Sequence, residues 1–180
     1  MTGSPPVQLG LVIGGARSGK SAFAERLVRA HGGARTYIAT AQAWDAEMRA
    51  RIDRHVADRG DDWVTVEAPL DLCAALGAVT SGVVLVDCAT LWLSNHLLAG
   101  ADLEFHSRAL TQALICCAVP VVIVSNEVGW SIVPDNALAR QFQDAQGRLN
   151  QALAERAGLV VAVMAGLPMV LKGVLPPLPC

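Results

Sequence analysis

Short apolar runs rich in β-branched residues alternate along this chain with stretches that have the three-to-four-residue spacing of a helix. The strands expected from the runs are 8–13, 36–40, 63–66, 83–87, 120–125 and 159–164, with a short further strand near 169–171. The helices expected between them are 19–30, 45–58, 70–78, 102–117 and 135–157. This alternation predicts βαβ units and an α/β fold with a mostly parallel central sheet flanked by helices.

The length of 180 residues fits one domain, and no repeat or long linker divides it. We expect a single domain over residues 1–180, with 1–7 and 174–180 as loose ends. The net charge of −2 indicates no broad cationic surface for nucleic acid or an anionic membrane. Hydrophobic residues make up 53% of the chain and charged residues 17%. This apolar composition predicts a sheet covered on both faces and apolar surface that meets another subunit.

No apolar run reaches the roughly 20 residues that a membrane-spanning helix needs. Residues 1–10 lack the basic start and the apolar middle of a signal peptide. The five cysteines form no C-x-x-C pair and are odd in number, which is typical of reduced thiols. We therefore expect a cytoplasmic protein without membrane insertion.

The first apolar run leads directly into GGARSGKS at 14–21, which has the G-x-x-x-x-G-K-S spacing of a phosphate-binding loop. Gly14 and Gly19 permit backbone angles that turn successive amides toward a phosphate, and the helix that follows adds its positive dipole end. Lys20 would reach the β- and γ-phosphates, and the Ser21 hydroxyl would bind Mg²⁺. The motif predicts binding of a nucleoside triphosphate.

A magnesium site beside such a loop normally needs a further acidic residue, often at the end of a neighbouring strand. Asp87 ends the apolar run 83–87 and has this position. An aspartate there can also cap the following helix. Because the phosphate loop lies upstream, we favour Asp87 as a ligand of Mg²⁺.

The stretch 45–59 predicts a helix on which Arg51, His55 and Arg59 follow one line, four residues apart. The two arginines favour a neutral imidazole and could hold a polyphosphate. A neutral imidazole beside phosphates is what a nucleophile on phosphorus requires. The alternative is a surface helix whose arginines pair with nearby carboxylates, and spacing alone does not decide between them.

Three further polar residues lie at strand ends, where α/β proteins place ligands. Asn126 and Glu127 follow the apolar run 120–125 and could contact substrate or metal, or only cap a turn. Glu67 follows the run 63–66 and could accept hydrogen bonds from a ribose or base, although an exposed glutamate is common at such a position.

Five motifs, taken in order, resemble one family closely. They are GGARSGKS at 14–21, YIATAQ at 37–42, DAEMRARIDRH at 45–55, VLVDCATLWLSN at 84–95 and SNEVGWSIVP at 125–134. The family is the bifunctional adenosylcobinamide kinase and adenosylcobinamide-phosphate guanylyltransferase of cobalamin biosynthesis. The resemblance extends over about residues 8–172, nearly the whole chain.

The resemblance implies two activities. In the first, ATP or GTP phosphorylates adenosylcobinamide. In the second, the histidine of the family attacks the α-phosphate of GTP and expels pyrophosphate, and adenosylcobinamide phosphate then takes GMP from the guanylyl-histidine to give adenosylcobinamide-GDP. This histidine falls on His55, which favours the nucleophile interpretation. Mg²⁺ is the implied cofactor, and the implied assembly is a homotrimer of single RecA-like phosphate-loop domains.

The implied nucleotide contacts include the phosphate loop and residues at three other places. They are Gly14, Gly15, Ala16, Arg17, Ser18, Gly19, Lys20, Ser21, Ala39, Thr40, Ala41, Val56, Ala57, Asp58, Arg59, Glu67 and Asp87. Lys20 and His55 are the implied catalytic residues, and Ser21 and Asp87 the implied magnesium ligands. Relatives often have a basic residue where this chain has Val56, so phosphate binding there would depend more on Arg59 and the backbone.

Two other functions compete with this one. The first is a small-molecule kinase with a phosphate loop, in which His55 is only structural and no nucleotide is transferred. The second is a nucleotide-dependent switch, but such proteins usually recognise guanine through N-K-x-D, and this string does not occur in the chain.

Overall fold

The computed structural model describes residues 8–42 and 62–178. Its strands form one seven-stranded sheet in the order β3-β2-β4-β5-β1-β6-β7, and β7 alone is antiparallel to its neighbour. The predicted α/β class with a mostly parallel sheet is confirmed. The bounds are β1 Leu9–Gly14, β2 Arg35–Ala39, β3 Val64–Glu67, β4 Val83–Asp87, β5 Val121–Asn126, β6 Leu159–Met164 and β7 Leu167–Lys172.

The helices in the described residues are α1 Lys20–His31, α3 Leu72–Ala78, α4 Ala89–Leu98, α5 Leu103–Cys116 and α6 Ala137–Arg156. Four of them agree with predicted helices to within about two residues, as expected for helix ends. The predicted helix 45–58 lies outside the described residues. Asp71, Asp102 and Asn136 cap α3, α5 and α6 by accepting hydrogen bonds from first-turn amides.

Helix α4 was not predicted, and its burial explains why. Amphipathic periodicity appears in a sequence when one side of a helix faces water. In α4 the polar residues Thr90, Asn95 and His96 are buried together with Trp92 and Leu93. The helix therefore has no polar stripe that the sequence pattern could reveal. The final strand is also longer than the predicted 169–171, because β7 extends over Leu167–Lys172.

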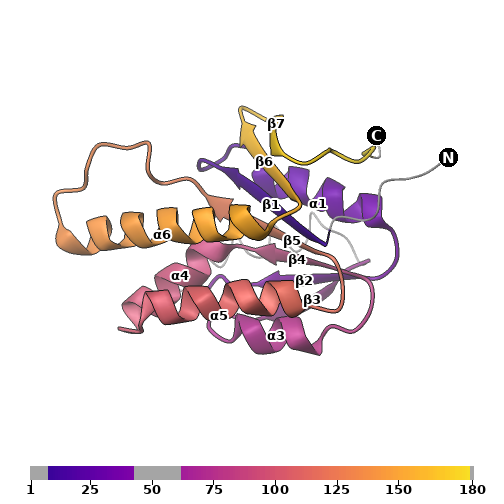
Figure 1. Ribbon diagram of the computed structural model, residues 1–180, viewed down its shortest axis with the longest axis horizontal. Coiled ribbons are helices and arrows are strands. Elements are labelled where there is room, and N and C mark those ends of the chain that lie inside the picture. The colour runs from indigo at the N-terminus through magenta and orange to yellow at the C-terminus, as the bar shows by residue number, and fades with distance from the viewer. Residues whose placement is uncertain (1–7, 43–61, 179–180) are drawn as a thin grey trace.

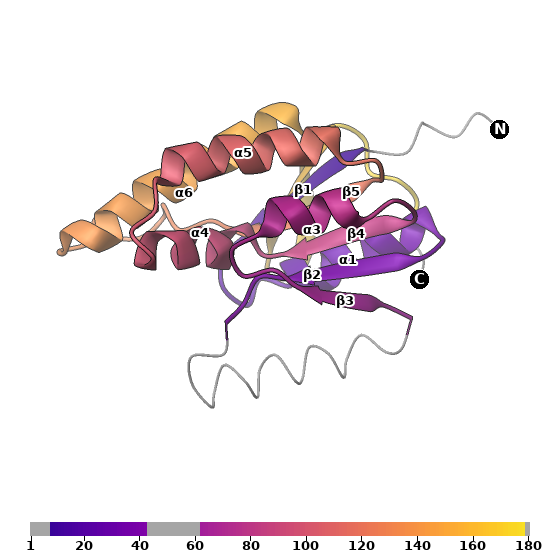
Figure 2. The ribbon, with the colours of Figure 1, turned by 90° about the horizontal axis from the view of Figure 1, so that it is seen from below.

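Two apolar cores lie on the two faces of the sheet (Figures 1 and 2). On one face, α1 packs Phe23, Leu27 and Val28 against the strands. On the other, α3, α4, α5 and α6 cover the sheet, and Trp92 and Leu110 are fully buried there. The prediction that both faces are covered is confirmed. Leu175 and Leu178, in the segment expected to be loose, pack against the α1-side core.

Two further findings concern the setting of the protein. Within residues 8–42 and 62–178, none of the helices has the length and apolar content needed to span a membrane. The cysteines in these segments, Cys73, Cys88, Cys116 and Cys117, are all free thiols.

Candidate nucleotide-binding and active site

The phosphate loop joins β1 to α1 at the carboxyl edge of the sheet. Arg17 and Gly19 have positive φ angles of 56° and 91°, and the Ser18 amide donates to the Gly15 carbonyl at 3.3 Å, so the loop is tightly curled. Gly19 begins α1 without a side-chain cap, unlike the aspartates and asparagine that begin α3, α5 and α6. The first amides of α1 therefore have no side-chain acceptor and suit an anion.

Close packing around the loop requires its glycines. A Cβ on Gly14 would lie 2.5 Å from the Val163 carbonyl oxygen, and one on Gly19 would lie 3.2 Å from Gly166 Cα. The Gly166 amide donates to the Ser18 carbonyl at 2.8 Å. The turn between β6 and β7 thus supports the loop from behind. Sequence reasoning missed this support, since Gly166 is far from the motif along the chain.

Lys20 lies at the start of α1 and folds back over the loop. Its Nζ donates to the Gly15 carbonyl at 3.2 Å, which keeps the ammonium group at the loop that it is predicted to serve. The buried Ser18 hydroxyl has no hydrogen-bond partner among the described residues. A concave loop with a cation and inward polar atoms is suited to a polyphosphate.

Asp87 ends β4 at the same edge of the sheet. The Tyr37 hydroxyl donates to Asp87 Oδ2 at 3.0 Å and so orients the carboxylate. The Asp87 carboxylate and the Ser21 hydroxyl are hard oxygen donors of the kind that Mg²⁺ prefers, so the donor set fits this ion. Tyr37 was not predicted as a site residue, although it begins the motif at 37–42.

Thr40 and Cys88 hold the backbone next to Asp87. Thr40 is fully buried, and its hydroxyl donates to the Cys88 carbonyl and accepts from the Cys88 amide, both at 2.8 Å. Asn95 of α4 donates to the Thr40 carbonyl at 2.9 Å. Burial and the nearby Asp87 carboxylate raise the pKa of the Cys88 thiol to about 11. This thiol is therefore protonated at neutral pH and is a poor nucleophile.

The strand β5 lies between β1 and β4, so its end comes between the phosphate loop and Asp87. The Asn126 amide donates to the Thr90 hydroxyl at 2.7 Å, and the Asn126 carbonyl accepts from Asn150 at 3.1 Å. Its buried Oδ1 has no partner among the described residues. Glu127 accepts a hydrogen bond from the Gly129 amide at 2.7 Å, which is the turn-capping arrangement.

The strand register brings the predicted site residues to one edge. Ala39 is paired with Glu67 on one side and with Asp87 on the other, while Gly14 is paired with Asn126. Residues of the loop, of β2, of β3 and of β4 are thus neighbours, as parallel strands require of their carboxyl ends. The remaining predicted site residues, His55, Val56, Ala57, Asp58 and Arg59, lie outside the described residues.

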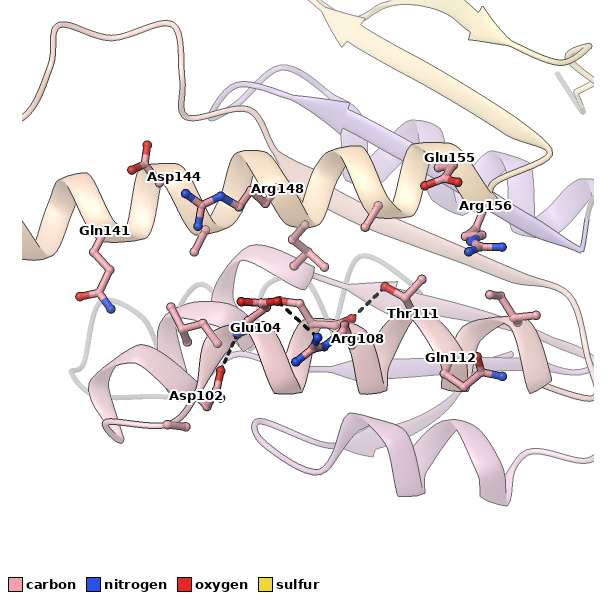
Figure 3. Close-up of a pocket in the computed structure, with 17 residues that line it drawn as sticks. Asp102, Glu104, Arg108, Thr111, Gln112, Gln141, Asp144, Arg148, Glu155 and Arg156 are labelled. Atoms are coloured by element: carbon pink, nitrogen blue, oxygen red, sulfur yellow. Dashed lines mark hydrogen bonds and ion pairs between the residues drawn. The ribbon is translucent and has the colours of Figure 1, made fainter.

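A groove of about 950 Å³ lies elsewhere, between α5 and α6 on the four-helix face. Figure 3 shows Glu104 and Arg108 of α5 facing it across from Arg148 of α6. Arg108 pairs with Glu104 at 3.3 Å. None of the predicted site residues lines this groove. The candidate site is therefore the carboxyl edge of the sheet and not this groove.

The fold resembles those of two solved structures. The P4 protein from bacteriophage phi6 in complex with ADP is 18% identical, with a TM-score of 0.47, over 90% of this chain and 52% of that one. The RadB recombinase is 17% identical, with a TM-score of 0.49, over 97% of this chain and 84% of that one.

Sequence comparison gives much closer relatives. The bifunctional adenosylcobalamin biosynthesis protein CobP of Pseudomonas aeruginosa is 48% identical over 167 residues, 91% of this chain and 96% of its own. The bifunctional adenosylcobalamin biosynthesis protein CobU of Escherichia coli is 41% identical over 179 residues, and the match covers 90% of this chain and 98% of the relative's chain. The family model described as cobinamide kinase / cobinamide phosphate guanyltransferase matches residues 10–171. This chain therefore belongs to the cobinamide kinase and cobinamide phosphate guanyltransferase family.

Proposed function

We propose that this protein phosphorylates adenosylcobinamide with ATP or GTP, and transfers GMP from GTP to adenosylcobinamide phosphate, giving adenosylcobinamide-GDP and pyrophosphate. One observation carries the proposal. In a chain of this family, an uncapped helix start and a curled phosphate loop lie at the same sheet edge as a carboxylate that Tyr37 orients. These are the parts that a phosphoryl-transfer site needs.

The phosphate loop and Lys20 would hold the triphosphate in both reactions. The loop amides and the α1 dipole attract the phosphates, and Lys20 adds a point charge at the loop, where its Nζ donates to the Gly15 carbonyl. Ser21 and Asp87 would hold Mg²⁺, which when bound neutralises charge on the phosphate oxygens. Tyr37 would keep the Asp87 carboxylate in one orientation.

His55 is the proposed nucleophile of the transfer reaction. Its neutral imidazole nitrogen attacks the α-phosphorus of GTP, a P–N bond forms, and the bond to the bridging oxygen of the β-phosphate breaks, so that pyrophosphate leaves. A phosphate oxygen of adenosylcobinamide phosphate then attacks the same phosphorus. This P–O bond forms as the P–N bond breaks, and the imidazole is restored. His55 lies outside the described residues. The support for this step is therefore the sequence motif at 45–55 and the spacing of His55 from its two arginines.

Other nucleotide contacts are proposed at the same edge. Ala39 ends β2 and Thr40 and Ala41 follow it, and Glu67 ends the neighbouring strand, where it could accept hydrogen bonds from ribose or base. The Thr40 side chain is already engaged with Cys88, so Thr40 would contribute by keeping this edge in place. The stretch 56–59 would bind phosphate mainly through Arg59 and the backbone.

We further propose that the protein is a cytoplasmic homotrimer. Support comes from the apolar surface that it leaves uncovered on β7, where Leu167, Met169 and Leu171 are exposed. An edge strand with this much apolar surface commonly meets another chain.

The decisive experiment is mass spectrometry of the protein after incubation with GTP and Mg²⁺, with the modified residue mapped by peptide. We expect a guanylyl adduct on His55. The variant His55→Ala should form no adduct but keep its kinase turnover, whereas His31→Ala, which alters the last residue of α1, should behave as the wild type. An adduct that persists in His55→Ala would require another nucleophile. Phosphorylation of adenosylcobinamide with no adduct in the wild type would indicate a plain kinase.

A further inference from the structure

The segment between β5 and α6 presents apolar side chains to solvent. Trp130, Ile132 and Val133 are 78%, 94% and 73% exposed, and Leu138 at the start of α6 is also exposed. We call these four residues the apolar tip. Figure 1 shows this segment standing out from the end of the sheet at which β5 finishes. Clustered exposed apolar residues are typical of a surface that binds something.

Polar anchors hold this segment in one shape. Arg140 donates to the Pro134 and Asp135 carbonyls at 2.9 and 2.8 Å, and Gln143 donates to the Val128 carbonyl at 3.0 Å. At the other end, Glu127 holds the Gly129 amide at 2.7 Å. The apolar tip is therefore presented by a braced loop, and its side chains remain outside the core although the backbone is fixed.

The braced loop starts next to the phosphate loop. The Glu127 amide donates to the Gly14 carbonyl at 3.1 Å, and β1 and β5 are neighbours in register up to Gly14 and Asn126. A ligand whose reactive arm reaches the phosphates held by the phosphate loop would therefore have its body at this edge of the sheet. The apolar tip is on that side of the molecule.

We propose that the apolar tip binds the corrin macrocycle of adenosylcobinamide, an inference that rests on the proposed function. The macrocycle is too large for the phosphate loop, and only its aminopropanol arm has to reach the phosphates. Its faces carry methyl groups, which pack well against an indole and branched side chains. Adenosylcobinamide is a cation, and residues 127–140 contain two carboxylates, Glu127 and Asp135, and one arginine, Arg140, whose guanidinium is bonded to the Pro134 and Asp135 carbonyls. The apolar side chains and their place beside the phosphate loop thus suit this substrate.

The test compares Trp130→Ala with Trp130→Phe in the full-length protein. For Trp130→Ala we expect the KM for adenosylcobinamide to rise about tenfold, with kcat and the KM for the nucleotide little changed, because a large aromatic contact is lost. Trp130→Phe should keep most of the affinity. Adduct formation from GTP needs no corrinoid, so its rate should equal that of the wild type in both variants. Val174→Ser, which alters a residue 76% exposed beyond β7, should leave every constant unchanged.

Ile132→Ser provides a second measurement of the same kind, since a substitution at a fully exposed site rarely affects folding. An unchanged KM for adenosylcobinamide in both Trp130→Ala and Ile132→Ser, with normal adduct formation, would overturn the docking proposal alone. A smaller assembly in sedimentation, with an unchanged KM, would show that the tip joins subunits and would also overturn it. A wild-type protein that does not act on adenosylcobinamide would overturn the proposed function and this inference together.

Discussion

The two faces of the sheet are built differently and do different work. Among the described helices, α1 alone covers one face, while α3, α4, α5 and α6 cover the other. The proposed chemistry belongs to the α1 face and its edge, where the phosphate loop, Lys20 and the Tyr37–Asp87 hydrogen bond are found. The four-helix face contributes buried apolar side chains. A face with less helical cover leaves backbone amides and charged groups open to a ligand.

One buried polar cluster links helix α6 of the four-helix face to the end of β5 at the site edge. Ser125, Gln146 and Asn150 are buried on the four-helix side and hydrogen-bond one another at 2.6 to 2.9 Å. Asn150 also donates to the carbonyl of Asn126, the last residue of β5 beside the phosphate loop. A buried polar group costs stability unless it is hydrogen-bonded. Through this cluster, helix α6 of the four-helix face is hydrogen-bonded to the end of β5 at the site edge.

The largest expected effect is on the α1 face. Lys20→Ala should lower kcat/KM of both the kinase and the guanylyltransfer reaction by about 10²–10³-fold, because one cation serves both reactions. The free energy of unfolding should change by less than about 0.5 kcal/mol, since few contacts are lost. Initial rates and urea unfolding measure the two effects.

Arg108→Ala on the four-helix face is the matched control for Lys20→Ala. It removes an exposed cation from α5 and should alter neither rates nor stability measurably. Full activity of Lys20→Ala would contradict the assignment of function to the α1 face.

A core substitution on the four-helix face should lower the free energy of unfolding and leave the activity of the folded protein nearly unchanged. Leu110 is completely buried on α5, so Leu110→Ala should lower the free energy of unfolding by about 2–5 kcal/mol through lost contacts and a cavity. The kcat of the folded molecules should remain near that of the wild type. Leu98→Ala, at an exposed leucine of α4, should change stability little. A large loss of kcat in folded Leu110→Ala would show that this core shapes the site directly.

The smallest of the three effects tests the connecting cluster. Asn150→Ala leaves Ser125, Gln146 and the Asn126 carbonyl each without one partner, which should cost about 1–3 kcal/mol of stability. Because Asn126 lies beside the phosphate loop, the variant should also lose turnover, by a few-fold. Gln112→Ala, at an exposed glutamine of α5, is the control. Lower stability with unchanged turnover would make the cluster purely structural.

Helices α1, α3, α5 and α6 have their expected places because burial on one side of a helix leaves a periodic pattern. The central strands are buried on both faces, and they were predicted because such strands appear in the sequence as short continuous apolar runs. Helix α4 was missed because its polar residues, Asn95 among them, are buried and bonded to distant carbonyls. The sequence does not distinguish a polar residue that tertiary contacts bury from a polar residue that is exposed to water.

The residues of the candidate site also fall into those with a local sequence signal and those placed only by tertiary contacts. The phosphate loop is eight consecutive residues, so its spacing alone predicts its geometry, and Asp87 could be proposed as a site residue because a strand end is a local signal. Tyr37 is 50 positions from Asp87, and Gly166 is far from Ser18, so neither contact leaves a local signal.

The sequence by itself determined the α/β class, the phosphate loop with Lys20 and Ser21, and the family resemblance, because each depends on residues close together along the chain. The tertiary structure alone decided that Ala39, Glu67 and Asp87 are neighbours, that Tyr37 orients Asp87, and that the β6–β7 turn supports the loop. The physical reason is the register of parallel strands. Strand pairing brings distant residues within hydrogen-bond reach, and many sequences satisfy the same pairing.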